Sequence, residues 1–104
     1  AKEYLQQRGF SVLHNNWKYE CYEIDLIAAK NRKLHFVEVK TRKSSAFGFP
    51  EESVTKKKFD RLQKAAAQFQ YKHPQWRQVQ YDILSIFIDG NGKADYFYIE
   101  DVYL

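Results

Sequence analysis

Two strand-like runs joined by a short polar turn constrain this chain most, because they fix which residues face each other across a sheet. The runs span residues 21–29 and 34–41, and the turn between them is Lys30-Asn31-Arg32-Lys33. An antiparallel hairpin about this turn places Asp25 directly opposite Glu38. Side chains opposed in this way have Cβ atoms ~4.5–5.5 Å apart, and opposed like charges are destabilising. The pattern therefore predicts a cation between the two carboxylates.

The residues of both strands alternate so that each strand has one apolar face and one face that carries the charges. The same register sets Glu23 opposite Lys40, as the next pair along the face that holds Asp25 and Glu38. This charge-bearing face also holds Ile27 in the first strand and Phe36 in the second. The other face is expected to be apolar, and it would hold Ile24, Leu26 and Ala28 in the first strand and Val37, Val39 and Thr41 in the second.

The composition favours a single folded domain over residues 1–104. Hydrophobic residues make up 44% of the chain, which is more than disordered chains carry, and the length suffices for one core. Cys21 is the one cysteine, which excludes an internal disulfide and favours a reducing, cytoplasmic setting. No apolar run reaches the ~18–20 residues of a membrane span and no signal peptide is visible, so no membrane role is expected. Because the chain does not begin with Met, we expect its N-terminal helix to be truncated.

Basic residues flank the acidic pair in the sequence. The net charge of +4 suggests a polyanionic partner. Arg42 and Lys43 follow the second strand, and Lys56, Lys57 and Lys58 open the next helix. Of these, Arg42, Lys43, Lys56 and Lys57 are the candidates for DNA contacts. This distribution is expected if the phosphates of DNA approach metal-bound carboxylates. The alternative for each basic cluster is an ordinary solvated surface.

The rest of the pattern predicts a small α/β domain with the order helix, three strands, helix, two strands. Gly9 ends the first helix, and His73-Pro74 ends the second. Asp89-Gly90-Asn91-Gly92 predicts a hairpin turn. The expected elements are a helix over residues 1–8, strands over 10–17, 21–29 and 34–41, a helix from 51 or 53 to 72, and strands over 78–88 and 94–103.

The acidic pair suits a hard divalent cation. Mg²⁺ binds through one or two carboxylates and keeps water and phosphate oxygens around it, so Asp25 and Glu38 are ligands of the right type. The main-chain carbonyl of Val39 is a candidate third ligand. Lys40 is expected to orient the attacking water or to stabilise charge that develops on the phosphate. Glu23 would hydrogen-bond Lys40 or support the site as a further carboxylate. The alternative is a surface ladder of cross-strand charges.

These residues also form a known motif. An aspartate, followed after a short stretch by Glu-x-Lys at the end of the next strand, is the signature of the PD-(D/E)XK nuclease superfamily, and here it is Asp25 with Glu38-Val39-Lys40. The segments that run in the same order as in one family are Gly9-Phe10, Asn15-Asn16-Trp17, Glu23 to Ala28, Phe36 to Arg42, Phe47-Gly48-Phe49-Pro50, Val54 with Lys56 or Lys57, Arg61-Leu62 and Tyr81-Asp82-Ile83. Together they resemble the YraN-like family of bacterial proteins, predicted endonucleases related to Holliday-junction resolvases.

The resemblance implies a restriction-endonuclease-like domain, with a central mixed β-sheet flanked by helices. It implies Mg²⁺- or Mn²⁺-dependent hydrolysis of phosphodiester bonds in DNA, branched or otherwise structured DNA included, by a homodimer that cuts two strands symmetrically. In this family a Gly-Glu pair, whose glutamate is thought to complete the metal site, comes just before the segment that corresponds to residues 1–5. The present chain starts at Ala1, without that pair. The alternative function is a nuclease-like domain that binds nucleic acid or protein without cutting.

Other polar side chains are expected to be structural. His14, His35 and His73 lack the spacing of a zinc site. Asp82 begins a strand that reads as buried. Cys21 has no evident base partner, so the sequence gives no support to a nucleophilic cysteine mechanism.

Overall fold

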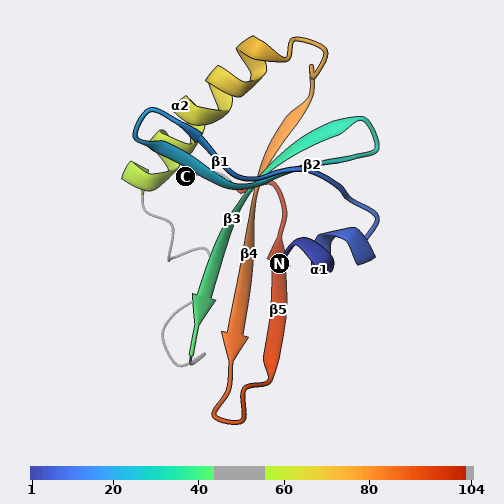
Figure 1. Ribbon diagram of the computed structural model, residues 1–104, viewed down its shortest axis with the longest axis vertical. Helices are drawn as coiled ribbons and strands as arrows, with labels where there is room; N and C mark the ends of the chain where they lie inside the picture. Colours follow the sequence, from blue (N-terminus) through green and yellow to red (C-terminus); the bar gives the residue numbers. More distant parts are fainter. Residues whose placement is uncertain (44–55, 103–104) are drawn as a thin grey trace.

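The computed structural model of the chain describes residues 1–43 and 56–102, which form one five-stranded sheet and two helices (Figure 1). The strand order is β1-β2-β3-β4-β5, with β3 and β4 parallel and the other neighbours antiparallel. The α/β class and the mixed sheet flanked by helices are thus confirmed. The elements are α1 (Lys2–Gln7), β1 (Ser11–Tyr19), β2 (Tyr22–Lys30), β3 (Lys33–Arg42), α2 (Lys56–Lys72), β4 (Val79–Ile88) and β5 (Ala94–Ile99).

The predicted hairpin and its register are confirmed. β2 and β3 pair from Lys30↔Lys33 to Leu26↔Val37 without a slip. The two turn residues, Asn31 and Arg32, both have positive φ, at 53° and 64°. A two-residue turn of this kind matches the twist of the strands that it joins, which explains why so short a connection suffices.

A hydrophobic core lies on each face of the sheet, because the two helices lie on opposite faces. Phe59, Leu62 and Phe69 of α2 pack on one face, against Phe36 and other buried residues. On the other face, Leu5 of α1 packs among Phe10, Leu26, Ala28, Val37, Leu84 and Ile86. The amphipathic stripe of α2 therefore matches the helical spacing in its sequence. No helix in the described part of the chain is long and apolar enough to cross a membrane.

The predicted faces of the hairpin strands are kept in β3 but not throughout β2. In β3, Val37 lies in one core, and Phe36, on the face predicted to carry Glu38 and Lys40, is fully buried in the other. In β2, Ile24 lies in the same core as Ile27, although Leu26 lies in the other core. The physical reason is that helices cover both faces of the sheet. In addition, β2 stops pairing with β3 after Leu26, so simple alternation is not kept beyond that residue.

The ends of two other elements also differ from expectation or lie outside the described residues. β5 ends at Ile99 rather than at 103, because Asp101 has a positive φ of 58° and its backbone N–H donates to Asp82 Oδ1 at 2.9 Å. The expected helix start at 51 or 53 lies outside the described residues.

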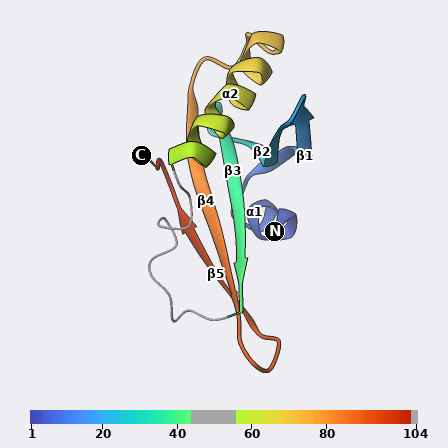
Figure 2. The same ribbon diagram turned by 90° about the vertical axis from the view of Figure 1, so that its left-hand side faces the viewer.

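The sheet is longer than the helices that cover it. The C-terminal ends of β3 and β4 and the turn between β4 and β5 extend beyond both helices in two perpendicular views (Figures 1 and 2). The predicted site residues of β2 and β3 lie beyond the last pair of the hairpin, Leu26↔Val37, where the two strands separate.

Candidate functional site

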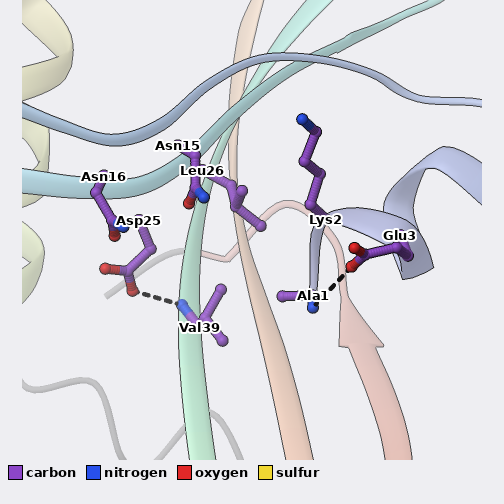
Figure 3. Close-up of a pocket in the computed structure, with 8 residues that line it drawn as sticks. All are labelled: Ala1, Lys2, Glu3, Asn15, Asn16, Asp25, Leu26 and Val39. Carbon is purple, nitrogen blue, oxygen red and sulfur yellow. Dashed lines mark hydrogen bonds and ion pairs between the residues drawn. The ribbon is translucent and has the colours of Figure 1, made fainter.

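Asp25 lies at the point where the hairpin opens. It comes one residue before Leu26, whose pair with Val37 is the last of the β2–β3 ladder when the ladder is counted from the turn. Its Oδ2 atom accepts a hydrogen bond of 2.8 Å from the backbone N–H of Val39 (Figure 3). The side chain thus replaces the next backbone contact of the ladder. The predicted role of Val39 involves its carbonyl, whereas the contact that the structure records is made by its N–H.

Asp25 and Glu38 are neighbouring carboxyl groups, although their predicted direct opposition lies one position beyond the last pair of the ladder. Burial raises the pKa of Asp25 most, and the charge of Glu23 raises it further, while the hydrogen bond from Val39 and the charge of Lys40 lower it in part. Burial also raises the pKa of Glu38, and the charge of Asp25 is the next cause. Both acids are therefore partly desolvated beside like charges, which disfavours their ionised forms.

Lys40 is the nearest recorded cation of the pair. Its Nζ lies 3.5 Å from Glu38 Oε1, and about a fifth of each side chain is exposed (19% and 20%). Glu38 and Lys40 lie on the face of β3 that α2 covers. They share this face with Phe36, which packs against that helix. The expected opposition of Glu23 to Lys40 lies beyond the end of the ladder, and the ion pair of Lys40 is with Glu38.

A cavity of about 160 Å³ joins Glu38 to α2. Glu23 contributes a second carboxylate to its wall, and Lys58 and Arg61 of α2 contribute positive charge; the remaining lining residues are Cys21, Tyr22 and Leu62. A hydrogen bond with Lys40, followed by burial, lowers the pKa of Lys58.

Sequence reasoning placed Lys58 in the basic cluster that opens α2, but it chose only Lys56 and Lys57 of that cluster as candidate site residues, and it missed Arg61. All three lysines lie exposed on the first turn of α2. A usable signal was present: Lys58 and Arg61 each directly precede a residue of the apolar stripe and lie three residues apart, on one side of that stripe. Arg42 ends β3 opposite Phe87 of β4, and Lys43 follows it with its side chain exposed.

A second cavity, of about 410 Å³, lies on the other side of Asp25. The side chain of Asn16 lies beside Asp25, and that of Asn15 lies beside Leu26 (Figure 3). Asn16 adopts a left-handed backbone conformation, with φ at 56°, which asparagine tolerates better than most residues. The rest of the wall is made by Val39 and by Ala1, Lys2 and Glu3 of the N-terminal segment. Asn15 and Asn16 were not among the predicted site residues.

The donor set is suited to a hard cation that keeps water in its coordination shell. Among residues 1–43 and 56–102, no group of three or more His, Cys, Asp or Glu side chains is arranged to hold a metal ion. Asp25 and Glu38 supply two carboxylates, which is the number that Mg²⁺ commonly takes from a protein. Burial is the main cause of their raised pKa values, and neighbouring negative charge is a further cause.

The histidines and Asp82 make structural contacts, as the sequence predicts. Asp82 is buried and accepts hydrogen bonds from His35 Nδ1 at 2.7 Å, from Gln80 Nε2 at 2.9 Å and from the Tyr98 hydroxyl. His73 Nδ1 donates to the backbone carbonyl of Phe69 at 2.9 Å, and His14 packs edge-on against the Phe69 ring.

Comparison with known proteins places the chain among bacterial sequences of one family. Residues 1–86 match the sequence model described as "Uncharacterised protein family UPF0102". A UPF0102 protein of Syntrophomonas wolfei is 38% identical over 98 residues, which is 92% of this chain and 85% of the relative. A UPF0102 protein of Dictyoglomus turgidum is 42% identical over 93 residues, covering 88% and 79% of the two chains. One of Rhodococcus opacus is 33% identical over 104 residues, covering 99% and 88%.

Proposed function

Since the chain belongs to the uncharacterised protein family UPF0102, its function has to be argued from its site, and we propose that it is a metal-dependent endonuclease. Its substrate would be the phosphodiester backbone of DNA, branched or otherwise structured DNA included. The observation that carries this proposal is the placement of two partly buried acids, Asp25 and Glu38, at the open end of a hairpin, where the charge of Asp25 helps to raise the pKa of Glu38 and Lys40 lies 3.5 Å from Glu38.

Keeping Asp25 and Glu38 ionised in this site costs free energy, and a bound cation would explain why both acids are there. Burial disfavours the ionised form of both acids, and a neighbouring negative charge adds to it, from Glu23 at Asp25 and from Asp25 at Glu38. A divalent cation would remove that penalty. Lys40 alone does not, because the pKa of Glu38 stays raised in its presence. Perturbed acids that cluster with a specific charged partner beside a cavity are typical of functional sites.

Each residue then has a role that its position allows. Asp25 and Glu38 would hold Mg²⁺ or Mn²⁺, with the carbonyl of Val39 as a further ligand. When bound, the ion supplies Lewis-acid activation of the phosphodiester and of water. Lys40 would orient the attacking water and balance negative charge that develops on the phosphate. Glu23 would hydrogen-bond Lys40 or support the site as a further carboxylate, in the wall of the cavity that Glu38 lines.

The basic residues would bind the DNA backbone. Lys58 and Arg61 face the cavity that Glu38 lines, so they are suited to phosphates next to the bond that is cut. Arg42 and Lys43, together with Lys56 and Lys57, stand further out and would hold flanking phosphates. Contacts of this kind position a duplex without reading its sequence, and they make binding depend on salt.

The proposal is tested by separating metal binding from cleavage. Wild-type protein should melt at a higher temperature in Mn²⁺, since a ligand bound only by the folded state stabilises it by ~2.7 kcal/mol at a hundred times its dissociation constant. Glu38→Gln should lose both the Mn²⁺ shift and the cleavage of DNA. Lys40→Ala should keep the shift and lose cleavage, because the lysine acts on water and phosphate rather than on the ion.

The matched control is Glu100→Gln, which changes an exposed glutamate outside the site. It should behave as wild type in both assays. Wild-type protein that shows no Mn²⁺ shift and cuts no DNA, yet binds DNA, would replace the proposal with a non-catalytic binding domain.

A further inference from the structure

A second set of charged side chains lies at the turn end of the β2–β3 hairpin, on the face of the sheet opposite to the one that carries Glu38. Lys30 and Lys33 are the first pair of the ladder, so two like charges stand directly opposite each other, which is destabilising. Lys33 alternates along β3 with His35 and Val37, and Val37 lies in the core beneath α1. This cluster is therefore separate from the proposed metal site.

A cavity of about 220 Å³ lies beside these two lysines. Its wall is made by residues from the hairpin turn, from the starts of β3 and β4 and from the end of β5: Lys30, Asn31, Lys33, His35, Gln80 and Glu100. Pockets for drug-sized ligands measure ~300–1,000 Å³, so this cavity suits a single small group. The two lysines supply positive charge, and Glu100 is the acid among the described residues of the wall.

Both lysine ammonium groups are held in place by neutral acceptors. Lys30 Nζ donates to the backbone carbonyl of Arg8 at 2.7 Å and lies 5.0 Å from the centre of the Phe10 ring. Lys33 Nζ donates to Gln80 Oε1 at 3.2 Å. Neither lysine has a recorded ion pair with a carboxylate of residues 1–43 and 56–102. An ammonium group has three hydrogens to donate, so each lysine keeps both its charge and further donors for a ligand.

His35 is a buried polar side chain that faces this cavity. It is 5% exposed, and its Nδ1 lies 2.7 Å from Asp82 Oδ2. Burial raises the pKa of Asp82, but its hydrogen bonds lower that pKa below the ordinary value, so Asp82 is a carboxylate and Nδ1 carries the hydrogen between them. In the described part of the chain no buried side-chain nitrogen or oxygen lacks a partner, and no bond is recorded for Nε2 of His35. We therefore expect Nε2 to open into the cavity.

The wall combines donors and acceptors, which restricts the kind of anion that fits. The two lysines donate to the oxygens of an oxyanion. In the neutral ring of His35, Nε2 is an acceptor, because the hydrogen of the ring is on Nδ1. The carboxylate of Glu100 is also an acceptor, and it repels a fully ionised ligand. An oxyanion that carries a hydrogen of its own can donate it to Nε2 or to Glu100. Hydrogen phosphate has such a hydrogen at neutral pH, whereas sulfate has none.

We propose that this cavity binds a protonated phosphate group, which inorganic phosphate or the terminal monoester of a nucleotide can supply. Lys30 and Lys33 balance its negative charge, and His35, held by Asp82, accepts its hydrogen. A phosphate monoester loses its second proton at pH ~6, so a fraction of it still carries a hydrogen near neutral pH. The phosphodiester within a DNA strand has no such hydrogen. The site therefore differs in ligand, as well as in place, from the proposed nuclease site.

The first test is calorimetric titration at neutral pH with inorganic phosphate and with sulfate, at equal ionic strength. Wild-type protein should bind phosphate more tightly than sulfate. Lys33→Gln should weaken phosphate binding at least about tenfold, because it removes a charged donor. Lys64→Gln is the matched control, since it removes an exposed charge from α2 on the other face, and it should bind as wild type. Absence of phosphate binding, equal binding of sulfate, or an equal loss in both variants would overturn the proposal.

A second test uses wild-type protein and so does not depend on how a variant folds. Inorganic phosphate should shift the backbone amide NMR signals of Asn31, His35 and Gln80, and leave that of the exposed Tyr71 on α2 in place. Thymidine 5′-monophosphate distinguishes the two sources of the group. Tighter binding than that of inorganic phosphate would identify a nucleotide terminus, and weaker binding would identify free phosphate. Equal shifts by thymidine without a phosphate, or shifts that miss this cavity, would overturn the proposal.

The phosphate site and the proposed metal site fail separately, because they lie on opposite faces of the sheet. Lys33→Gln should keep the Mn²⁺ shift, and Glu38→Gln should bind phosphate as wild type. Loss of phosphate binding in Glu38→Gln would contradict the separation of the two sites.

Discussion

At the scale of single residues, Asp25 has two tasks at once. One carboxylate oxygen accepts the Val39 N–H and so fixes where β2 leaves β3. The same carboxyl group is coupled to Glu38 and Glu23 through space. Replacing Asp25 therefore changes both the fold of the hairpin end and the charge of the site. Glu38 makes no such backbone contact among those recorded, so it is the better position for testing charge alone.

Glu38→Gln should stabilise the metal-free protein at neutral pH by ~0.5–1 kcal/mol, since it removes a repulsion between opposed like charges. The sign follows from the raised pKa of Glu38. The fold disfavours its ionised form, so wild-type protein loses stability as the pH rises from the ordinary value of 4.5 through the raised pKa. The variant should lack this loss. Urea denaturation at acidic and neutral pH measures it, and a variant less stable than wild type at neutral pH would contradict the account.

At the scale of elements, the tight turn of the hairpin carries local strain. Arg32 has a φ of 64°, a conformation that costs ~1–2 kcal/mol for most residues other than glycine. Asn31, with φ at 53°, tolerates this region better.

Arg32→Gly should therefore raise the free energy of unfolding by ~0.5–1 kcal/mol, after the entropic cost of glycine is subtracted. Asn31→Gly is the matched control in the same turn and should gain less. Both values come from urea denaturation, and a loss of stability in Arg32→Gly would show that the arginine side chain makes contacts that outweigh the strain.

Asp82 joins several elements. Its carboxylate accepts hydrogen bonds from His35 of β3, from Tyr98 of β5 and from the N–H of Asp101. Burial raises the pKa of Asp82, but these bonds and one from Gln80 outweigh burial, so the net pKa is below its ordinary value of 3.8.

Asp82→Asn should lower the free energy of unfolding by about 3 kcal/mol, because it removes a buried charge from its partners. In wild-type protein this contribution is present above the ordinary pKa and is lost as the pH falls through the lowered one. Asp95→Asn, at an exposed position of β5, should have little effect. A difference between the two variants that vanishes at neutral pH would refute this role.

The elements also show what the sequence could and could not predict. The β2–β3 register was predictable because a two-residue turn and the spacing of the charges fix it locally. The burial of Phe36 and the change of face at Ile24 could not be predicted in this way, because they depend on helices that pack on both faces of the sheet. The position of Lys58 beside Glu38 depends on how α2 approaches the sheet, a contact between elements far apart in the chain. The metal and DNA roles of these residues stay predictions.

At the scale of the whole molecule, the topology brings the acidic and basic residues together. The chain leaves β3, forms α2 over one face and returns as β4 parallel to β3. This crossover sets Lys58 and Arg61 of α2 beside the strand that carries Glu38. Acidic and basic side chains thus meet on one face of the sheet.

The most direct test of the central claim is cleavage of DNA by the purified protein in Mg²⁺ or Mn²⁺. The substrates are linear, flapped and four-way-junction DNA, compared side by side for wild type, Glu38→Gln and Glu100→Gln. The account predicts metal-dependent strand cutting by wild type and Glu100→Gln, with none by Glu38→Gln, and the three substrates then rank the preferred DNA structure. Absence of cutting on every substrate, or equal cutting by Glu38→Gln, would contradict it.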